Sequence, residues 1–252
     1  MRNRSCILTY HSLDTSGSVV SVPPDLFRAQ MAWLAQSGTP VVSLAEIQKM
    51  PGAVALTFDD GFRNFFQHAF PVLQRHGFPA TVFVVSGFCG GRNNWPTQPR
   101  NTRVPCLELM RWNEVRQVAQ AGIAIGCHTV NHPRLPRLAE GEVEEELRAS
   151  RTEIEDRVGK AVDTFAYPYG ETTPAIRRAV EGHFRFACGT RLAFVSGGAD
   201  ALCLPRLDIY YLQNHFWFRG LWKSYGAGYL AVRAWLRRFR RLREEGTAGA
   251  GL

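Results

Sequence analysis

The chain has 252 residues, 45% of them hydrophobic, which is enough for one large α/β domain or two small ones. No run is long and apolar enough to span a bilayer, and the opening residues lack the apolar segment of a signal peptide, so we expect a cytoplasmic location. The net charge of +8 comes from eight basic residues between positions 209 and 243, where no acidic residue occurs. The rest of the chain is neutral, so its charge does not indicate nucleic-acid binding.

In chain order, short apolar runs alternate with amphipathic segments. The predicted strands are residues 7–10, 40–43, 53–58, 80–85, 123–127, 164–167, 184–188 and 204–209. The predicted helices are residues 24–36, 62–76, 112–121, 140–158 and 173–180. This alternation is typical of parallel βαβ units, and about seven of them favour a barrel, closed or incomplete, over an open sheet. Residues 86–106 form a long loop rich in glycine, proline and asparagine, which is uncommon unless the loop lines a site.

Two neighbouring carboxylates, Asp59 and Asp60, come directly after the predicted strand 53–58, in the segment Thr-Phe-Asp-Asp-Gly at 57–61. Carboxylates at the end of a buried strand are costly unless they are paired or bind a cation. The pair therefore predicts a metal site, provided that other parts of the chain supply further ligands.

A pair of histidines, His128 and His132, follows the predicted strand 123–127 in the segment His-Thr-Val-Asn-His. On one helical turn, positions i and i+4 face the same way, so both imidazoles can reach one ion. With one of the two carboxylates at 59 and 60, they make a set of ligands that leaves positions open on Zn²⁺ or a similar divalent ion. Taken alone, such a pair is more often two surface or capping histidines.

Polar residues end four of the apolar runs, at His11, Asp59, His128 and Tyr169. In a parallel α/β barrel, the carboxyl ends of the strands share one face, where sites are built. One of the adjacent carboxylates would bind the metal and the other would take a proton from a metal-bound water. His11 is a candidate acid for a leaving amine, and the Pro-Tyr-Gly turn at 168–170 can aim a backbone N–H at an oxyanion. This chemistry is metal-assisted hydrolysis of an amide or ester.

Three motifs together resemble the first three motifs of the polysaccharide deacetylase family, which is also called the NodB-homology or carbohydrate esterase 4 family. They are residues 57–61, 128–132 and 165–170, and the resemblance extends from about residue 7 to residue 209. It implies a distorted (β/α)7 barrel that removes N-acetyl groups from amino sugars. It also implies Asp59 as the base, the N–H of Tyr169 as the oxyanion donor, and a metal held by Asp60, His128 and His132. The implied cofactor is a divalent ion, Zn²⁺ first, with Co²⁺ and Ni²⁺ as alternatives.

The chain departs from the family pattern at two places. In many members an Arg three residues before the third-motif Tyr orients the base, but here that position is Ala166, and no acid histidine follows the third motif. Both departures, with Tyr-His-Ser at 10–12, resemble the permuted branch that includes biofilm poly-N-acetylglucosamine deacetylases, which implies His11 as the acid. Arg206 is the candidate that orients Asp59 in place of the missing Arg, with a structural ion pair as the alternative.

The chain beyond the predicted catalytic barrel, residues 1–210, has a different composition. Aromatic and aliphatic residues recur every three or four positions between 215 and 243, with arginines mostly on the other side, and the glycines at 226–228 predict a break between two helices. We therefore expect residues 211–243 to form a basic helical tail, peripheral at the inner face of the membrane. The alternative is a helix packed across the open side of the barrel with a solvated basic face. Residues 244–252 are expected to be disordered.

The leading functional prediction is a metal-dependent N-deacetylase for amino sugars of a polysaccharide or lipid-linked glycan, with Asp59 as base on a metal-bound water. A second prediction keeps the mechanism but makes the enzyme a deformylase or O-deacetylase of a lipid-linked sugar. A third is a non-catalytic glycan-binding or assembly protein on the same fold. The intact carboxylate and histidine sets count against the third, because a binder needs no base beside a metal. If His11 is not the acid, His215 is the next candidate.

Overall fold

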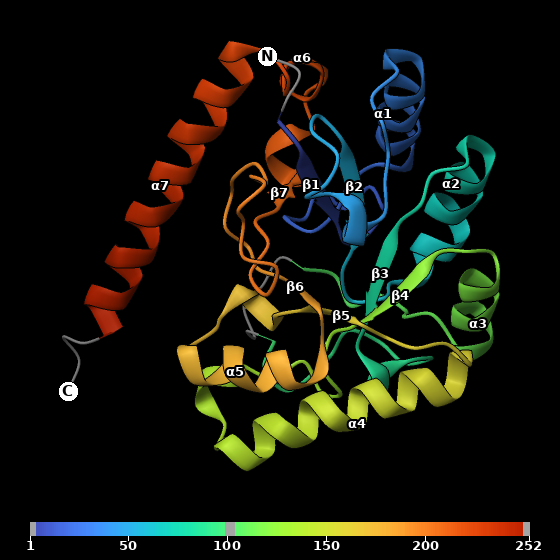
Figure 1. The fold of residues 1–252 in the computed structure, drawn as a ribbon, viewed down its shortest axis with the longest axis vertical. Helices are drawn as coiled ribbons and strands as arrows, with labels where there is room; N and C mark the ends of the chain where they lie inside the picture. Colours follow the sequence, from blue (N-terminus) through green and yellow to red (C-terminus); the bar gives the residue numbers. More distant parts are fainter. Residues whose placement is uncertain (1–3, 99–103, 249–252) are drawn as a thin grey trace.

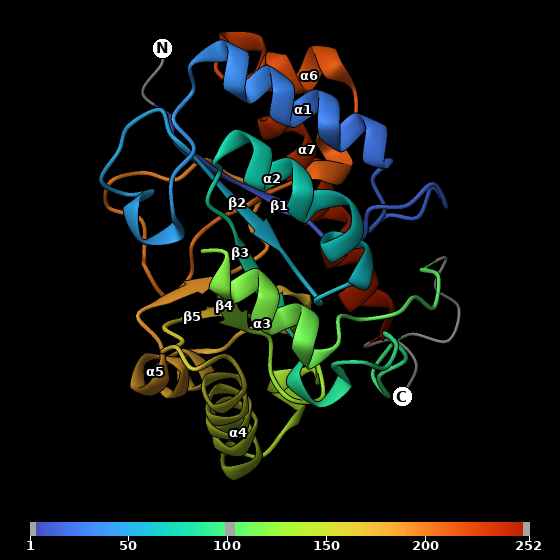
Figure 2. The same ribbon diagram turned by 90° about the vertical axis from the view of Figure 1, so that its right-hand side faces the viewer.

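Seven parallel strands form a curled sheet in the computed structural model, which describes residues 4–98 and 104–248 (Figure 1). The strands are β1 Cys6–Tyr10, β2 Val54–Phe58, β3 Thr81–Val84, β4 Ala124–Cys127, β5 Thr164–Ala166, β6 Phe186–Cys188 and β7 Leu207–Asp208, in the order β6-β5-β4-β3-β2-β1-β7. The α-helices are α1 Pro24–Ser37, α2 Phe70–His76, α3 Trp112–Gln120, α4 Glu140–Val158, α5 Pro174–His183, α6 His215–Arg219 and α7 Ser224–Ala248. Figure 2 shows α1, α2 and α3 covering the outer face of the sheet. The predicted distorted barrel with a C-terminal helical tail is confirmed.

The strands are buried on both faces, as their continuous apolar runs predict. In β1, Leu8 and Tyr10 belong to the large core beneath the helices, whereas Ile7 belongs to a smaller core with Phe83 on the inner face of the sheet. This inner core is tight, because a Cβ added at Gly126 of β4 would overlap the ring of Phe83. The inner face is therefore filled by side chains, and the cavity lies at one end of the strands.

Residues 204–208 close the curled sheet toward a barrel. Leu204 forms a parallel bridge with Cys188 at the end of β6, and Leu207 then pairs with β1 at the opposite edge of the sheet. Because the segment changes partner between these two contacts, β7 is much shorter than the strand predicted there. Arg206 lies between the two contacts and is only 3% exposed.

The predicted strand at residues 40–43 is wrong. Val41 forms a single bridge with Val54 at the start of β2, and the N–H of Val42 donates to the Val54 carbonyl at 2.8 Å. Beyond that point β2 is paired with β1 on one side and β3 on the other, so the segment has no free edge along which to continue.

The break in the C-terminal tail lies between α6 and α7, and the predicted break at 226–228 is wrong. Gly226 lies inside α7, and a Cβ there would overlap the carbonyl group of Gly220. This glycine allows the close approach of α7 to the preceding turn and does not end a helix. The helix continues to Ala248, and residues 249–252 of the expected disordered segment lie outside the described residues. Among the described residues, no helix is long and apolar enough to cross a membrane.

Candidate functional site

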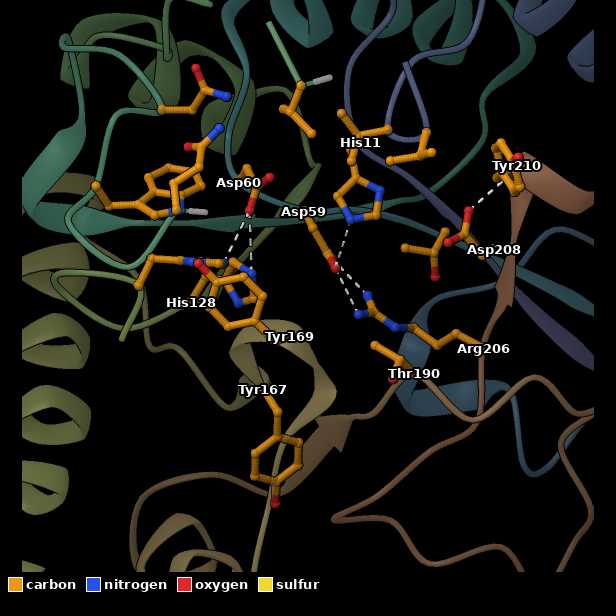
Figure 3. A pocket seen from close by; sticks show the side chains of 18 of the residues that line it. His11, Asp59, Asp60, His128, Tyr167, Tyr169, Thr190, Arg206, Asp208 and Tyr210 are labelled. Carbon is orange, nitrogen blue, oxygen red and sulfur yellow. Dashed lines mark hydrogen bonds and ion pairs between the residues drawn. The ribbon is translucent and has the colours of Figure 1, made fainter. Parts of the chain in front are cut away.

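The predicted site residues lie together at the carboxyl ends of the strands (Figure 3). His11 follows β1, Asp59 and Asp60 follow β2, and His128 follows β4. With Tyr169, which follows β5, they line one cavity of about 530 Å³, a size within the range of small-molecule sites. The structure thus brings together the residues that the strand-end argument placed on one face.

Asp60, His128 and His132 form a compact set of metal-ligand atoms. The Oδ1 atom of Asp60 lies 3.4 Å from Nε2 of His128 and 3.5 Å from Nε2 of His132. One ligand atom from each residue lies within 4.8 Å of the others, and all three side chains are buried. Nδ1 of His128 donates to the Ala166 carbonyl at 2.7 Å, which leaves Nε2 as the nitrogen that can bind a metal. This donor set fits a divalent ion such as Zn²⁺.

The environment of His132 also fits a metal ligand. Its Nδ1 is buried without a hydrogen-bond partner among the described residues, so the polar partner of this ring is on its Nε2 side. The ring is held by aromatic contacts, with centroid distances of 4.4 Å to Trp95 and 4.7 Å to Tyr169. The hydroxyl of Thr97 donates to the His132 carbonyl at 2.6 Å. Trp95 and Thr97 lie in the long loop at 86–106, which lines the cavity as predicted.

The segment 128–132 is not the helical turn that the sequence predicted. Thr129 has a φ of 68° and His132 a φ of 52°, both in the left-handed region. The turn is held by side chains, because the His132 N–H donates to the Thr129 hydroxyl at 3.0 Å and Glu146 accepts the N–H groups of residues 130 and 131. The two imidazoles still meet, with 4.8 Å between ring centroids.

Asp59 is held from two sides. Arg206 donates two hydrogen bonds to its carboxylate, from Nη1 to Oδ1 and from Nη2 to Oδ2, both at 2.7 Å. The guanidinium is fixed in turn because its Nε donates to the Gly189 carbonyl at 3.0 Å. Nε2 of His11 approaches Asp59 Oδ2 from another direction at 3.8 Å, as Figure 3 shows. The structure thus pairs Arg206 with Asp59, as expected for the candidate that would orient it.

Neighbouring cations keep both carboxyl groups ionised. Burial raises the pKa of Asp59, but the charge and hydrogen bonds of Arg206, together with the nearby charges of His11 and His128, outweigh that effect, and the pKa lies well below its usual value. Burial also raises the pKa of Asp60, and the hydrogen bond with His128 is the main interaction that brings it below its usual value. Each carboxylate is thus ready to accept a proton or bind a cation at neutral pH.

The two histidines differ in their protonation. Burial, and then the nearby charge of His128, lowers the pKa of His132 to about 3, so its imidazole is neutral as a metal ligand must be. Burial also lowers the pKa of His128, but the hydrogen bond with Asp60 and the charges of Asp59 and Asp60 together outweigh it, and the net shift is upward. Metal binding to such a site displaces the proton that His128 and Asp60 would otherwise share.

Backbone strain is concentrated at this site. Among the described residues, those other than glycine with a positive φ are Asp60 at 71°, Thr129 at 68°, His132 at 52° and Tyr169 at 59°. Each such conformation costs about 1–3 kcal/mol and persists only where the surrounding structure enforces it. Tyr169 is fixed through its hydroxyl, 3.1 Å from that of Thr97, and through Arg134, which packs over its ring at 4.4 Å.

Two arginines at the cavity were not predicted. Arg134 lies two residues after His132 and forms an ion pair with Glu171, so its nearness to the histidine motif was an available signal. Arg237 of α7 lines the same cavity and donates to the Thr190 carbonyl at 3.0 Å. No signal in the sequence indicated Arg237, because helical spacing placed it on the solvated side of the tail.

The alternative acid His215 lies on α6, is exposed, and is not among the residues that line the cavity. His11 therefore remains the candidate acid.

The sequence and fold are similar to those of known proteins. The family described as "Polysaccharide deacetylase" matches residues 47–183. The chain is 28% identical over 183 residues to YxkH of Bacillus subtilis (strain 168), which covers 69% of this chain and 60% of YxkH. It is 25% identical over 179 residues to a poly-β-1,6-N-acetyl-D-glucosamine N-deacetylase of Staphylococcus aureus (strain MSSA476), which covers 63% of this chain and 58% of that protein. The chain thus spans about 60% of the length of these two relatives.

The solved structure of IcaB from Ammonifex degensii has the same fold, with a TM-score of 0.74 and 23% identity. That similarity covers 89% of this chain and 98% of the IcaB chain.

Proposed function

The chain belongs to the polysaccharide deacetylase family, in the branch that includes biofilm poly-N-acetylglucosamine deacetylases, and we propose that it is a metal-dependent hydrolase that removes N-acetyl groups from amino sugars of a polysaccharide or lipid-linked glycan. The observation that carries the proposal is the pairing of two carboxylates in one cavity. Asp60 faces the two histidines, and Asp59 faces Arg206 and His11. Adjacent residues are thereby separated into a metal ligand and a base.

Asp60, His128 and His132 would hold the ion, for which Zn²⁺ is the first candidate, with Co²⁺ and Ni²⁺ as alternatives. When bound there, a divalent ion supplies a Lewis acid that polarises the acetyl carbonyl and lowers the pKa of a water.

The remaining groups move protons and stabilise charge. Asp59, kept ionised and oriented by Arg206, takes the proton of the attacking water. The N–H of Tyr169 donates to the carbonyl oxygen as it gains negative charge. His11 then gives a proton to the sugar nitrogen as the C–N bond breaks, so that acetate and a free amine leave the site.

The proposed function is tested by measuring acetate release from polymeric and lipid-linked N-acetylglucosamine substrates. We expect one acetate for each free amine formed, loss of the activity when a chelator removes divalent metal, and recovery when Zn²⁺, Co²⁺ or Ni²⁺ is added back. Formate release, or loss of ester-linked acetyl groups only, would identify a different acyl substrate. No release from any substrate by the metal-loaded protein would contradict the proposal.

A matched pair of histidine variants separates the metal site from general effects. His132→Ala removes one of three ligands, so elemental analysis should show a clear loss of bound metal together with activity. His215→Ala changes an exposed histidine outside the cavity and should keep both. Unchanged metal content in His132→Ala would contradict the assignment of this ligand.

His11→Ala is expected to lower kcat for the amide substrate by about 10²-fold, because the leaving amine then lacks its proton donor. Metal content should stay at the wild-type value. Hydrolysis of 4-nitrophenyl acetate should fall much less, because nitrophenolate leaves without needing a proton. An equal loss on the amide and on this ester would instead assign His11 a role in holding the site together.

A further inference from the structure

Exposed hydrophobic side chains gather on the two C-terminal helices. Nine large hydrophobic side chains are exposed in the part of the chain that the structure describes, and six of them lie on α6 and α7. We call these six the exposed stripe: Phe216, Tyr225, Val232, Trp235, Leu236 and Phe239. Trp235 and Val232 are each 57% exposed. Such a concentration on two consecutive helices indicates a surface that meets an apolar partner.

Most of the exposed stripe lies along one face of α7 that is open to solvent. Positions 225, 232, 236 and 239 of α7 follow one another at intervals of seven, four and three residues, which places them on one helix face. Ring contacts join its members, with 4.9 Å between the centroids of Phe216 and Tyr225 and 4.4 Å between those of Trp235 and Phe239. Figure 1 shows α7 along one side of the molecule, with no other element on its outer side.

The opposite face of α7 holds the helix to the body. Leu230 is buried on this face, and Arg237 donates to the Thr190 carbonyl at the cavity. At the edge of the exposed stripe, the hydroxyl of Tyr229 donates to the Tyr211 carbonyl at 2.8 Å. Part of α7 therefore packs across the barrel, which agrees with the alternative prediction for the tail. That packing leaves the exposed stripe uncovered.

The positive charge of the tail indicates an anionic partner. Eight basic residues and no acidic one occur between 209 and 243, so an anionic surface is electrostatically complementary to it. A second copy of the chain is a poor partner, because a symmetric contact would bring two basic helices together. Aromatic and aliphatic side chains flanked by arginines suit the interfacial layer of a bilayer, and α7 does not meet the requirements of a spanning helix.

We propose that the exposed stripe seats α7 in the interfacial layer of an anionic phospholipid membrane, with the exposed basic residues Arg219, Lys223 and Arg233 contacting lipid phosphates. Because Arg237 of the same helix lines the cavity, this orientation brings the cavity close to the bilayer surface. The proposal goes beyond the deacetylase reaction and stands on the surface of α6 and α7 alone.

Vesicle co-sedimentation tests it with the full chain. We expect binding to phosphatidylcholine vesicles that contain phosphatidylglycerol, with much weaker binding in 0.5 M salt and to phosphatidylcholine alone. Trp235→Ser/Phe239→Ser should weaken binding to the anionic vesicles at least ten-fold. Arg219→Gln/Lys223→Gln, at two exposed basic residues of the tail, should weaken it about 25-fold, because each basic residue near an anionic leaflet contributes about 1 kcal/mol.

Met50→Ser is the matched control, since Met50 is 41% exposed but lies outside the stripe, and it should bind like the wild type. Equal thermal unfolding midpoints for all variants would show that each is folded, whether or not it deacetylates any substrate. No binding to anionic vesicles at low salt, or undiminished binding of Trp235→Ser/Phe239→Ser, would overturn the proposal. A second result would also overturn it: the wild type forms a dimer in sedimentation velocity, the stripe variant does not, and neither binds vesicles. A second copy of the chain would then cover the stripe.

Discussion

Asp59→Asn is expected to lower kcat for acetate release by about 10²–10⁴-fold while bound metal stays at the wild-type value. The amide cannot accept the proton of the attacking water, which removes general-base catalysis. The metal ligands are left intact, because Asp60 and not Asp59 faces the two histidines. Turnover measured beside elemental analysis checks both parts. A kcat within a few-fold of the wild type would assign the base to another residue.

Asp208→Asn is the control for this variant. Asp208 lines the same cavity, and its carboxylate accepts the backbone N–H of Tyr210 at 2.9 Å, a bond that an Asn side chain can also accept. The same acid-to-amide change should therefore leave kcat within a few-fold of the wild type. A large loss in both variants would indicate a general effect of charge in the cavity.

Arg206→Met is expected to reduce the free energy of unfolding at neutral pH by about 3–5 kcal/mol, because it leaves the buried Asp59 carboxylate without its partner. In the wild type, Arg206 holds the pKa of Asp59 below its unfolded value. The resulting stability is present above the unfolded pKa and is lost as pH falls through the lower folded pKa. The variant should lack this contribution at neutral pH. Denaturant unfolding as a function of pH measures the difference.

The same substitution should change the pH dependence of activity. Arg206 is the strongest of the interactions that lower the pKa of Asp59, so without it that pKa rises and the acid limb of the rate profile should move to higher pH. Arg206→Lys should fall between the wild type and Arg206→Met, because an ammonium keeps the charge but not the two parallel hydrogen bonds. An unchanged acid limb in Arg206→Met would show that the pair is structural and does not tune the base.

A double-mutant cycle separates these two roles of the pair. Asp59→Asn leaves a buried guanidinium unpaired and Arg206→Met leaves a buried carboxylate unpaired, so each single change carries a desolvation cost that the double variant avoids. The double variant should lose less stability than the sum of the single losses, but it should be no more active than Asp59→Asn. Recovery of stability without activity would assign the proton transfer to Asp59 and the orientation to Arg206.

The tertiary structure was needed wherever partners are far apart in the chain. The strand predicted at 40–43 has good local composition, but β2 already has neighbours on both sides. The turn at 128–132 was predicted as helical because the two histidines are four residues apart, which is the spacing of one helical turn. That spacing does not reveal that hydrogen bonds to Thr129 and Glu146 hold the backbone in another conformation. Arg237 was placed on a solvated face, because helical spacing gives the faces of a helix but not which of them meets the barrel.

The sequence by itself determined the alternating α/β architecture and the location of the candidate site, since apolar runs each ending in His, Asp or Tyr need no long-range information to be recognised. It placed Asp59, Asp60, His128 and His132 correctly on one face because parallel strands share their carboxyl ends. Only the tertiary structure decided that Arg206 pairs with Asp59. The reason is physical: the two residues are 147 positions apart, and they meet because residues 204–208 cross from β6 to β1 and close the sheet.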